Sequence, residues 1–420
     1  MKNRYLATII LSLLLIFTAN CSQKAQHVEF NGQYYNPQLA DNPAAFIDTL
    51  QYRSFMYFID QTNPANGLVK DRSTSTSFSS IAAVGFAIPG WAIGAERGWI
   101  SHKQASELTL NTLRFFWNSE QSPDPRSTGF KGFYYHFLTM DKGKRFRDCE
   151  LSTIDTALLL AGVRFAYNYY NTDDPVDKEI RQLADSLTFR TDWDWFTFPD
   201  SGTHAEAISM GWRPERGFVN AAWTGYNEAL ILHILAAGSG YKGAEKAYER
   251  WLDKYDWRKP YSDIELASFP PLFGHQYSQM FIDFRDLPDS YMREKHSDYF
   301  RNAKRAAIVQ HRYAIENPLE WVGYDSLTWG LTACDGPGPE FNTGTRQFRR
   351  YSARGTSGPD LIHNDDGTIA PTAAAASIDY LPNLVVPTLL NMYTKYGPEG
   401  LWGKYGFYDA FNPTIDWYNP

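Results

Sequence analysis

Cysteine and net charge are both scarce in this sequence. Three cysteines occur in 420 residues, and the net charge of −7 comes without any basic block. Attraction to nucleic acid or to an anionic membrane surface is therefore not expected. The cysteines do not have the spacing of a zinc site, and two positions as distant as Cys149 and Cys334 do not indicate a disulfide. We expect both residues to be free, buried thiols.

Several motifs of nucleotide binding and catalysis are also absent. The segment "DGPG" is not followed by Gly-Lys-Ser/Thr, which excludes a P-loop. There is no dinucleotide-binding glycine fingerprint, no nucleophile elbow for a Ser-His-Asp triad and no repeat of about 34 or 40 residues. No cluster has recognisable metal-ligand spacing, so no metal or other cofactor is expected.

Long hydrophobic runs are missing except at the N-terminus. There "LATIILSLLLIFTAN" follows two basic residues and ends at Cys21, and it is too short for a comfortable membrane span. The segment resembles a bacterial lipoprotein signal, although Thr18 replaces the usual leucine; an ordinary signal peptide or anchor is the alternative. We expect a signal peptide over residues 1–21, lipidation of Cys21 and a flexible tether over residues 22–42. The protein would then be lipid-anchored in the cell envelope, on the outer membrane or the periplasmic face.

Aromatic residues, in contrast, are abundant: 13 Trp, 27 Tyr and 27 Phe make up 16% of the chain. Core packing accounts for many of them. A carbohydrate cleft is the second interpretation, because the C–H faces of sugar rings stack on Trp and Tyr while sugar hydroxyls need polar partners. Composition leaves both interpretations open.

The chain beyond the tether has helical periodicity, with no competing set of alternating short β runs. The helical segments are residues 42–60, 79–95, 101–117, 152–170, 176–190, 226–238, 243–255, 298–315, 369–381 and 383–397. So many helices without strands predict one all-α domain over residues 43–420, in which paired helices close into a ring. The loops at one end of such a toroid can build a long cleft. An open helical solenoid is the alternative.

Carboxylates gather where the predicted helices begin. In "CELSTIDTALLLAG", Glu150 precedes a helix and Asp155 lies in its first turn. Ser152 and Asp155 have capping-box spacing, so a capping role competes with an active-site role for Asp155. In "MGWRPERGF", Glu215 stands between two arginines, which would lower its pKa and suit sugar binding or a surface ion pair.

Glu228 is the most suggestive of these carboxylates. In "WTGYNEALILHIL" we expect Thr224 to cap the helix, which places Glu228 in the first helical turn. The helix dipole would lower the pKa of Glu228, whereas burial beside Trp223 and Tyr226 would raise it. Only a raised pKa makes Glu228 a general acid at neutral pH, and a mere stabilising role at the helix N-terminus is the alternative.

Further polar residues lie in aromatic and Gly/Pro-rich loops of the C-terminal half. A metal site in "FGHQYSQMFIDFRD" is a minor alternative to a glycan site, because the spacing matches no ligand motif and the aromatics favour sugar. Carboxylates among aromatics on the loops of one helical domain are typical of glycoside hydrolases. The candidates here are His275, Gln276, Tyr277, Asp283, Arg285 and Asp335.

The run of motifs resembles the bacterial glucoamylase-like domain family that includes the β-1,2-glucanases. The segments "RSFMYFIDQTNPANGLVKDRS", "GFYYHFLTMDKGKR", "CELSTIDTALLLAGV", "MGWRPERGF", "YNEALILHIL", "FGHQYSQMFIDFRD", "WGLTACDGP" and "DGTIAPTAAAASI" carry it in the family's order. The resemblance implies an (α/α)6 barrel and hydrolysis of β-1,2-linked glucan, endo- or exo-acting, with inversion. It implies Glu228 as general acid, with Glu150 and Asp155 as further catalytic candidates. Substrate contacts would come from Trp212, Glu215, Trp223, Tyr226, His275, Gln276, Tyr277, Asp283, Arg285 and Asp335.

Two departures from the family pattern put the subsite pattern and product length in doubt. Gln279 occupies the position of a histidine in the family's "GHQYSH", and the glycine-serine turn after the "YNEA" helix lacks the family's proline-threonine-histidine continuation. Relatives also continue beyond "DAFNPTIDWYNP", so we expect the last helical segment to be missing from this chain; a barrel that closes differently is the alternative.

We expect a monomer with a glucan polysaccharide or oligosaccharide as its partner, and no contact with the membrane beyond the lipid. The rivals are a non-catalytic surface glycan-binding lipoprotein and a hydrolase of another glucan linkage.

Overall fold

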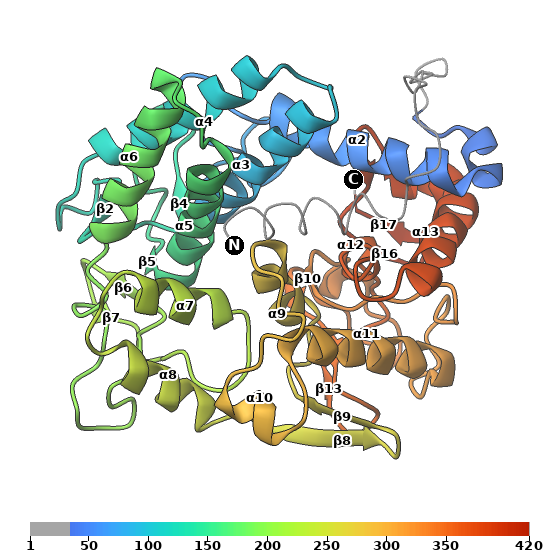
Figure 1. Ribbon diagram of the computed structural model, residues 1–420. Helices are drawn as coiled ribbons and strands as arrows, with labels where there is room; N and C mark the ends of the chain where they lie inside the picture. Colours follow the sequence, from blue (N-terminus) through green and yellow to red (C-terminus); the bar gives the residue numbers. More distant parts are fainter. Residues whose placement is uncertain (1–33, 420) are drawn as a thin grey trace. The chain divides into compact units, whose positions relative to one another are not determined.

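The structure is a computed structural model that describes residues 34–419. The chain divides into two compact units (Figure 1). We call residues 54–255 the central unit, and residues 1–53 together with 256–420 the terminal unit. Helix α2 (Pro43–Asp60) contributes residues to both units, and the single domain expected over residues 43–420 stays a prediction. Cys21 and the predicted signal peptide lie outside the described residues.

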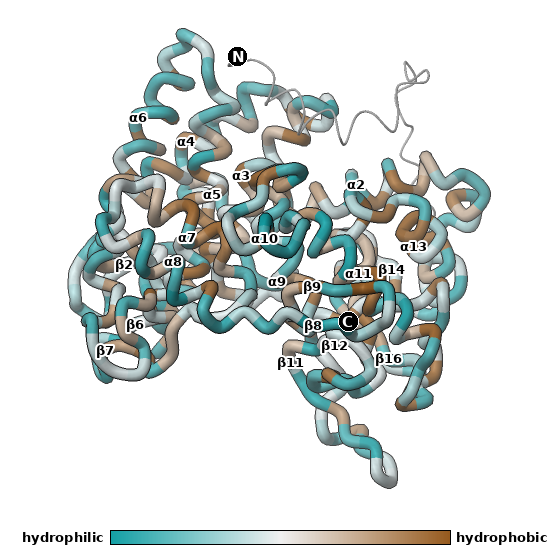
Figure 2. Tube along the Cα trace, turned by 60° about the horizontal axis from the view of Figure 1, so that its bottom comes forward, coloured by the Kyte–Doolittle hydropathy of each residue, from teal (hydrophilic) through white to brown (hydrophobic). Residues whose placement is uncertain are grey.

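The central unit is built on helix α5, which packs against α3, α6 and α7. Long apolar stretches along α5 and α7 make this packing favourable (Figure 2). Helices α3 and α5 approach so closely that a Cβ on Gly162 would lie 2.2 Å from the carbonyl oxygen of Gly85. The helices of this unit are α3 (Ile81–Glu96), α4 (His102–Asn118), α5 (Thr153–Tyr169), α6 (Pro175–Phe189), α7 (Leu230–Gly238) and α8 (Ala244–Leu252).

The terminal unit has its own apolar core, to which α11 and α13 contribute buried faces. Its helices are α9 (Phe273–Gln276), α10 (Ser290–Glu294), α11 (Tyr299–Glu316), α12 (Pro371–Ala375) and α13 (Pro382–Tyr396), with short helices η1 (Pro37–Asp41), η2 (Tyr277–Met280), η3 (Pro339–Phe341) and η4 (Gly397–Leu401). Helix α12 forms only part of the predicted segment 369–381, since it begins at Pro371 and ends at Ala375. Just beyond its end, the Ser377 hydroxyl donates to the Ala373 carbonyl.

Residues 34–42 do not behave as a free tether. Asn36 donates its N–H to the Tyr393 hydroxyl at 2.8 Å, and that hydroxyl donates to the Asn36 carbonyl at 2.7 Å. The ring of Tyr35 packs on Tyr393 with centroids 4.7 Å apart. The predicted tether over residues 22–42 is therefore wrong in its last nine positions, which pack against α13.

Short strands connect the helices, contrary to the expectation of a strand-free domain. They are β1 (Ser79–Ser80), β2 (Gly129–Phe130), β3 (Phe133–Tyr134), β4 (Phe137–Leu138), β5 (Leu151–Ser152), β6 (Gly211–Arg213), β7 (Gly217–Phe218), β8 (Trp257–Tyr261), β9 (Ile264–Ala267), β10 (Ala333–Cys334), β11 (Ser352–Ala353), β12 (Gly355–Thr356), β13 (Ile362–His363), β14 (Trp402–Gly403), β15 (Gly406–Phe407), β16 (Phe411–Asn412) and β17 (Trp417–Tyr418). Strands β8 and β9 form a hairpin, and β5, β6 and β7 form one antiparallel sheet. Most are only two residues long, which is too short for the sequence periodicity to indicate them.

Several predicted helix starts are confirmed by their caps. Ser101 and Gln104 form a capping box at α4, and the Ser80 side chain accepts the N–H of Ala83 at the start of α3. Among residues 34–419 no helix combines the length and apolarity needed to cross a membrane. Cys149 and Cys334 are both free, and Cys334 is buried whereas Cys149 is part-buried.

Candidate active site

A histidine of the central unit lies between two of the predicted carboxylates. His136 Nδ1 is 3.0 Å from Glu150 Oε1, and His136 Nε2 is 3.5 Å from Asp155 Oδ1. The three side chains are 30%, 22% and 13% exposed, so the cluster is accessible from solvent. We call these three residues the carboxylate–histidine cluster.

The main chain brings the cluster together around the start of α5. The N–H of His136 donates to the Glu150 carbonyl at 2.9 Å. Glu150 directly precedes β5, whose Leu151 pairs with Trp212 of β6. This register carries Arg213 to Glu150, where Arg213 Nη2 donates to Oε2 at 2.8 Å.

Asp155 belongs to the cluster and also contacts Ser152, the residue that caps α5. The Ser152 hydroxyl accepts the N–H of Asp155 at 3.2 Å and donates to Asp155 Oδ2 at 2.5 Å. Ser152 is therefore the N-cap of α5, whereas the Asp155 carboxylate bonds the Ser152 hydroxyl and not the backbone N–H that a capping box uses. The other carboxylate oxygen, Oδ1, faces His136.

The charges in the cluster move the pKa values of His136 and Glu150 in opposite directions. Burial alone would lower the pKa of His136, but Asp155 and the hydrogen-bonded Glu150 raise it to about 9. Burial would raise the pKa of Glu150, but the hydrogen bond from His136, its own backbone N–H and the charges of His136 and Arg213 lower it to about 2. At neutral pH, Glu150 is ionised and His136 is protonated.

Glu228 differs from Glu150 in that its surroundings raise its pKa instead of lowering it. Helix α7 begins at Leu230, and its N-cap is Ala229, whose N–H is bonded by the Asn227 side chain at 3.0 Å. The expectation that Thr224 caps the helix is therefore wrong, because Asn227 closes the turn, and Glu228 precedes the helix instead of lying in its first turn. Burial raises the pKa of Glu228 to about 7, against the effect of its own backbone N–H, and the negative charge of Asp155 adds to the rise.

Glu215 pairs with an arginine that its sequence neighbourhood does not suggest. Arg145 donates to the two carboxylate oxygens at 2.6 and 3.1 Å, while Arg213 is engaged with Glu150. The hydrogen bond from Arg145 is the main cause that lowers the pKa of Glu215, and the charge of Arg216 contributes less. The predicted direction is thus correct, but its cause is mainly a residue 70 positions away.

Trp212, which precedes Arg213 on β6, belongs to a part-exposed group of aromatic side chains. Its ring lies 5.3 Å from that of Trp195 and 5.9 Å from that of Phe130. Phe218, 39% exposed, packs on Trp195 as well. Trp223 and Tyr226 are instead buried, and the indole N–H of Trp223 donates to the Thr153 hydroxyl at 2.8 Å.

The predicted site residues His275 and Gln276 lie in the terminal unit and are buried. His275 Nε2 is 2.9 Å from the Phe269 carbonyl, and its Nδ1 is 3.3 Å from the Asn302 amide. Burial lowers the pKa of His275 to about 4, so the ring is neutral. Gln276 donates to the Ala373 carbonyl at 2.8 Å.

The other predicted residues of this unit are part-exposed. Arg285 donates to Asp283 at 3.0 Å and to Asp379 at 2.7 Å. Tyr277 packs its ring on Phe273, with centroids 5.3 Å apart. Asp335 accepts from the Asn419 side chain at 3.3 Å.

The terminal unit also contains a fully buried charged group, which we call the Arg354 network. Arg354 and Asp366 have side chains 0% and 1% exposed, with Nε 2.7 Å from Oδ1. The guanidinium also donates to the carbonyls of Cys334 and Arg349, each at 2.9 Å. It therefore ties together the two ends of the Gly/Pro loop that begins at Asp335.

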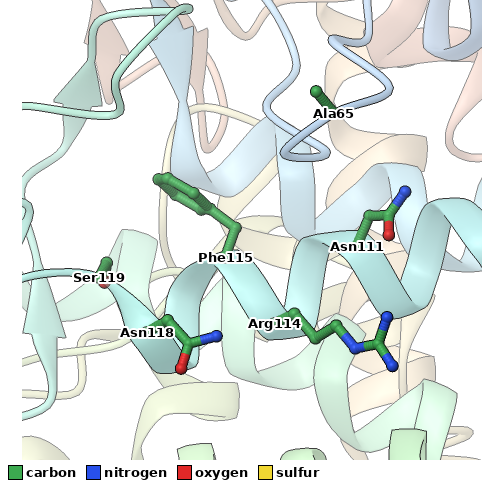
Figure 3. Close-up of a pocket in the computed structure, with 6 residues that line it drawn as sticks. All are labelled: Ala65, Asn111, Arg114, Phe115, Asn118 and Ser119. Atoms are coloured by element: carbon green, nitrogen blue, oxygen red, sulfur yellow. The ribbon is translucent and has the colours of Figure 1, made fainter.

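A shallow pocket lies on α4 (Figure 3). None of its lining residues is a carboxylate or belongs to the carboxylate–histidine cluster, and Arg114 there is held by Glu179 at 2.6 and 2.7 Å. The pocket therefore does not mark the reacting groups. Its lining residues are Ala65, Asn111, Arg114, Phe115, Asn118 and Ser119.

His136 is the site residue that sequence reasoning missed. It lies within the quoted "GFYYHFLTMDKGKR", but its carboxylate partners are 14 and 19 positions away and meet it only through the pairing around β5. A single polar residue inside the apolar and aromatic run "FYYHFL" was the available signal. Among residues 34–419 no group of three or more His, Cys, Asp and Glu side chains is arranged to hold a metal ion.

Known proteins resemble this chain along most of its length. The family described as "Putative glucoamylase" matches residues 220–420. An exo β-1,2-glucooligosaccharide sophorohydrolase (non-reducing end) of Parabacteroides distasonis is 28% identical over 408 residues, which is 89% of this chain and 52% of that protein. The chain thus spans about half the length of this curated relative.

Two solved structures share the fold. An endo-β-1,2-glucanase of Chitinophaga pinensis, in complex with sophorotriose and glucose, has a TM-score of 0.75 at 25% identity, covering 90% of this chain and 88% of that one. A β-1,2-glucanase of Parabacteroides distasonis has a TM-score of 0.73 at 27% identity, covering 90% and 54% of the two chains. These similarities confirm the predicted all-α fold of the (α/α)6 type.

Proposed function

We propose that this chain, which belongs to the glucoamylase-like family that includes the β-1,2-glucanases, is a glycoside hydrolase that cleaves β-1,2-linked glucan. The relatives support the substrate: one is a β-1,2-glucooligosaccharide sophorohydrolase and another an endo-β-1,2-glucanase. The central unit supports the reaction, because at the same pH one of its carboxyl groups can be protonated while another is ionised.

One observation carries the proposal. Glu228 has a pKa raised to about 7, while Glu150 has a pKa lowered to about 2. Two carboxyl groups with pKa values pushed apart by their surroundings are what acid and base roles in glycoside hydrolysis require. Glu228 therefore serves as the general acid that protonates the glycosidic oxygen as the bond to the leaving sugar breaks.

The second role needs an ionised carboxylate that activates water. Glu150, Asp155 and Asp335 are its candidates, and the family resemblance implies direct attack by water with inversion. Asp155 is favoured among the two of the central unit, because both carboxylate oxygens of Glu150 are held at 3.0 Å or less by Arg213 and His136, whereas the short bond of Asp155 comes from the neutral Ser152 hydroxyl. The rings of Trp212, Trp195 and Phe218 next to Arg213 offer part-exposed faces for sugar.

A product profile on defined β-1,2-, β-1,3-, β-1,4- and α-1,4-glucans tests the proposal. We expect cleavage of the β-1,2-glucan, and the chain length of the products then distinguishes endo from exo action. Cleavage of only another linkage would contradict the substrate. Calorimetric binding of β-1,2-glucan without any cleavage would instead identify a glycan-binding protein.

For its location we propose a lipid-anchored protein of the cell envelope, supported by the N-terminal segment that ends at Cys21. Replacing the cysteine in Cys21→Ala should move the protein from the membrane fraction to the soluble fraction, because the acyl chains would have no attachment point. Unchanged membrane association would count against lipidation.

A further inference from the structure

Both ring nitrogens of His136 face carboxylate oxygens. Nδ1 is 3.0 Å from Glu150 Oε1, and Nε2 is 3.5 Å from Asp155 Oδ1. An ionised carboxylate only accepts hydrogen bonds, and a neutral imidazole carries one N–H. Both contacts are favourable together only when the ring carries two protons and a positive charge.

Of the two carboxylates that face the ring, Glu150 has a second cationic partner, so the positive charge of His136 is available to compensate Asp155. Arg213 occupies the second oxygen of Glu150 at 2.8 Å and neutralises that carboxylate. Asp71, in the loop before β1, adds a further negative charge near the ring. The positive charge of His136 is thus the compensation available to Asp155, whose Oδ2 is taken by the neutral Ser152 hydroxyl.

The ring is also fixed in orientation. The backbone of His136 is held on both sides, by its N–H to the Glu150 carbonyl at 2.9 Å and by its carbonyl to the Ile81 N–H at 3.2 Å. The imidazole stacks on Phe137, with centroids 3.8 Å apart and planes 20° from parallel. A side chain 30% exposed, held this rigidly between charges, is preorganised without being a core residue.

We infer that His136 is a positioning residue whose ring, held between Glu150 and Asp155, orients the Asp155 carboxylate. The inference rests on the proposed hydrolase function. His136 touches neither the glycosidic bond nor the water in this role; it acts through Asp155.

The consequence concerns the pH range in which Glu150 is ionised while Glu228 still carries a proton. Without the positive ring, Glu150 loses a hydrogen-bond donor and the cluster takes up protons more readily, so activity should fail at a higher pH on the acidic side. The uncompensated charge of Asp155 would also raise the pKa of Glu228 further, which moves the alkaline limit upward. Both limits should therefore move in the same direction.

The charge on the ring can be measured in the unmodified protein. We expect nitrogen-15 NMR of histidine-labelled protein, with His136 assigned by comparison with His136→Gln, to show both ring nitrogens protonated at pH 7.5. A neutral His136 ring at that pH would overturn the inference. This measurement needs no substrate, so it decides the inference even if the wild-type protein cleaves no glucan, a result that would count against the proposed function alone.

Kinetics on β-1,2-glucan supply the second readout. His136→Gln should lower kcat by about 10- to 100-fold, with KM within about threefold, and should shift both pH limits upward. The control His102→Gln, which replaces an exposed histidine of α4, should leave both unchanged. A loss of kcat with unmoved pH limits would indicate a packing role only and would overturn the inference.

Discussion

The two units contain charged clusters of similar chemistry in different surroundings. In the central unit, His136, Glu150 and Asp155 remain 30%, 22% and 13% exposed. In the terminal unit, Arg354 and Asp366 are 0% and 1% exposed, and the guanidinium donates mostly to main-chain carbonyls. The difference separates two uses of charge: the Arg354 network holds a loop, whereas the carboxylate–histidine cluster keeps charge where a substrate can reach it.

The largest effect should come from substitution of Glu228, and it should appear in the activity and not in the stability of the protein. Glu228→Gln keeps the shape of the side chain but removes the proton that the general acid donates, so kcat should fall by about 10²- to 10⁴-fold. Steady-state rates on β-1,2-glucan give the loss, and calorimetry should find substrate binding largely retained. Near-normal turnover would contradict the assignment of Glu228.

The Arg354 network should respond in the opposite way, through stability. Arg354→Met removes one partner of a buried ion pair and leaves Asp366 charged and uncompensated, which costs about 3–5 kcal/mol. Urea unfolding measures this loss. The control Arg312→Met breaks the exposed pair with Asp263 and should change the free energy of unfolding little. Equal effects of the two substitutions would remove the distinction between the clusters.

A smaller effect is expected from His233 of the central unit, which is buried, in contrast to the part-exposed His136. His233 is 3% exposed, neither ring nitrogen has a hydrogen-bond partner among the described residues, and burial lowers its pKa to about 3 from the ordinary 6.5. Below pH 6.5, His233 therefore binds a proton in the unfolded chain but stays neutral in the folded protein. Stability from this residue is complete above pH 6.5 and lost as the pH falls towards 3, by about 2–3 kcal/mol at pH 4.5.

His233→Leu tests this prediction, because leucine does not titrate. The difference in the free energy of unfolding between pH 7 and pH 4.5 should shrink in the variant by that amount. His275, whose pKa is lowered in the same direction, leaves a remaining acid dependence. An unchanged difference would show that His233 does not stay neutral in the folded protein.

The elements could be predicted from sequence where local signals sufficed. Helix α4 follows its apolar period and the Ser101 cap, and α5 follows the Ser152 cap. The start of α7 could not be predicted, because Asn227 bonds the main chain where Thr224 was expected to cap. Local pattern does not reveal which of several polar residues will close a turn.

The site was predictable in its residue types more than in its pairings. The sequence identified Glu228 but left the direction of its pKa shift open between the helix dipole and burial, and burial decides it. The Arg145–Glu215 pair and the His136 contacts join residues from different loops, and only the pairing around β5 and β6 brings them together. Such contacts depend on the register of short strands, which the sequence does not indicate.

The contact between α3 and α5 has a consequence for redesign of the site. A side chain on Gly162 would collide with the Gly85 carbonyl, and one on Gly85 would lie 2.3 Å from the Leu158 carbonyl. Asp155 lies about two helical turns before Gly162 on the same helix, so its height along α5 is set by this crossing. Gly211, on the strand that carries Arg213, is packed in a similar way, because a Cβ there would lie 2.8 Å from the Glu150 side chain. Redesign of the surrounding loops therefore has to keep these three glycines if Asp155 and Glu150 are to stay in place.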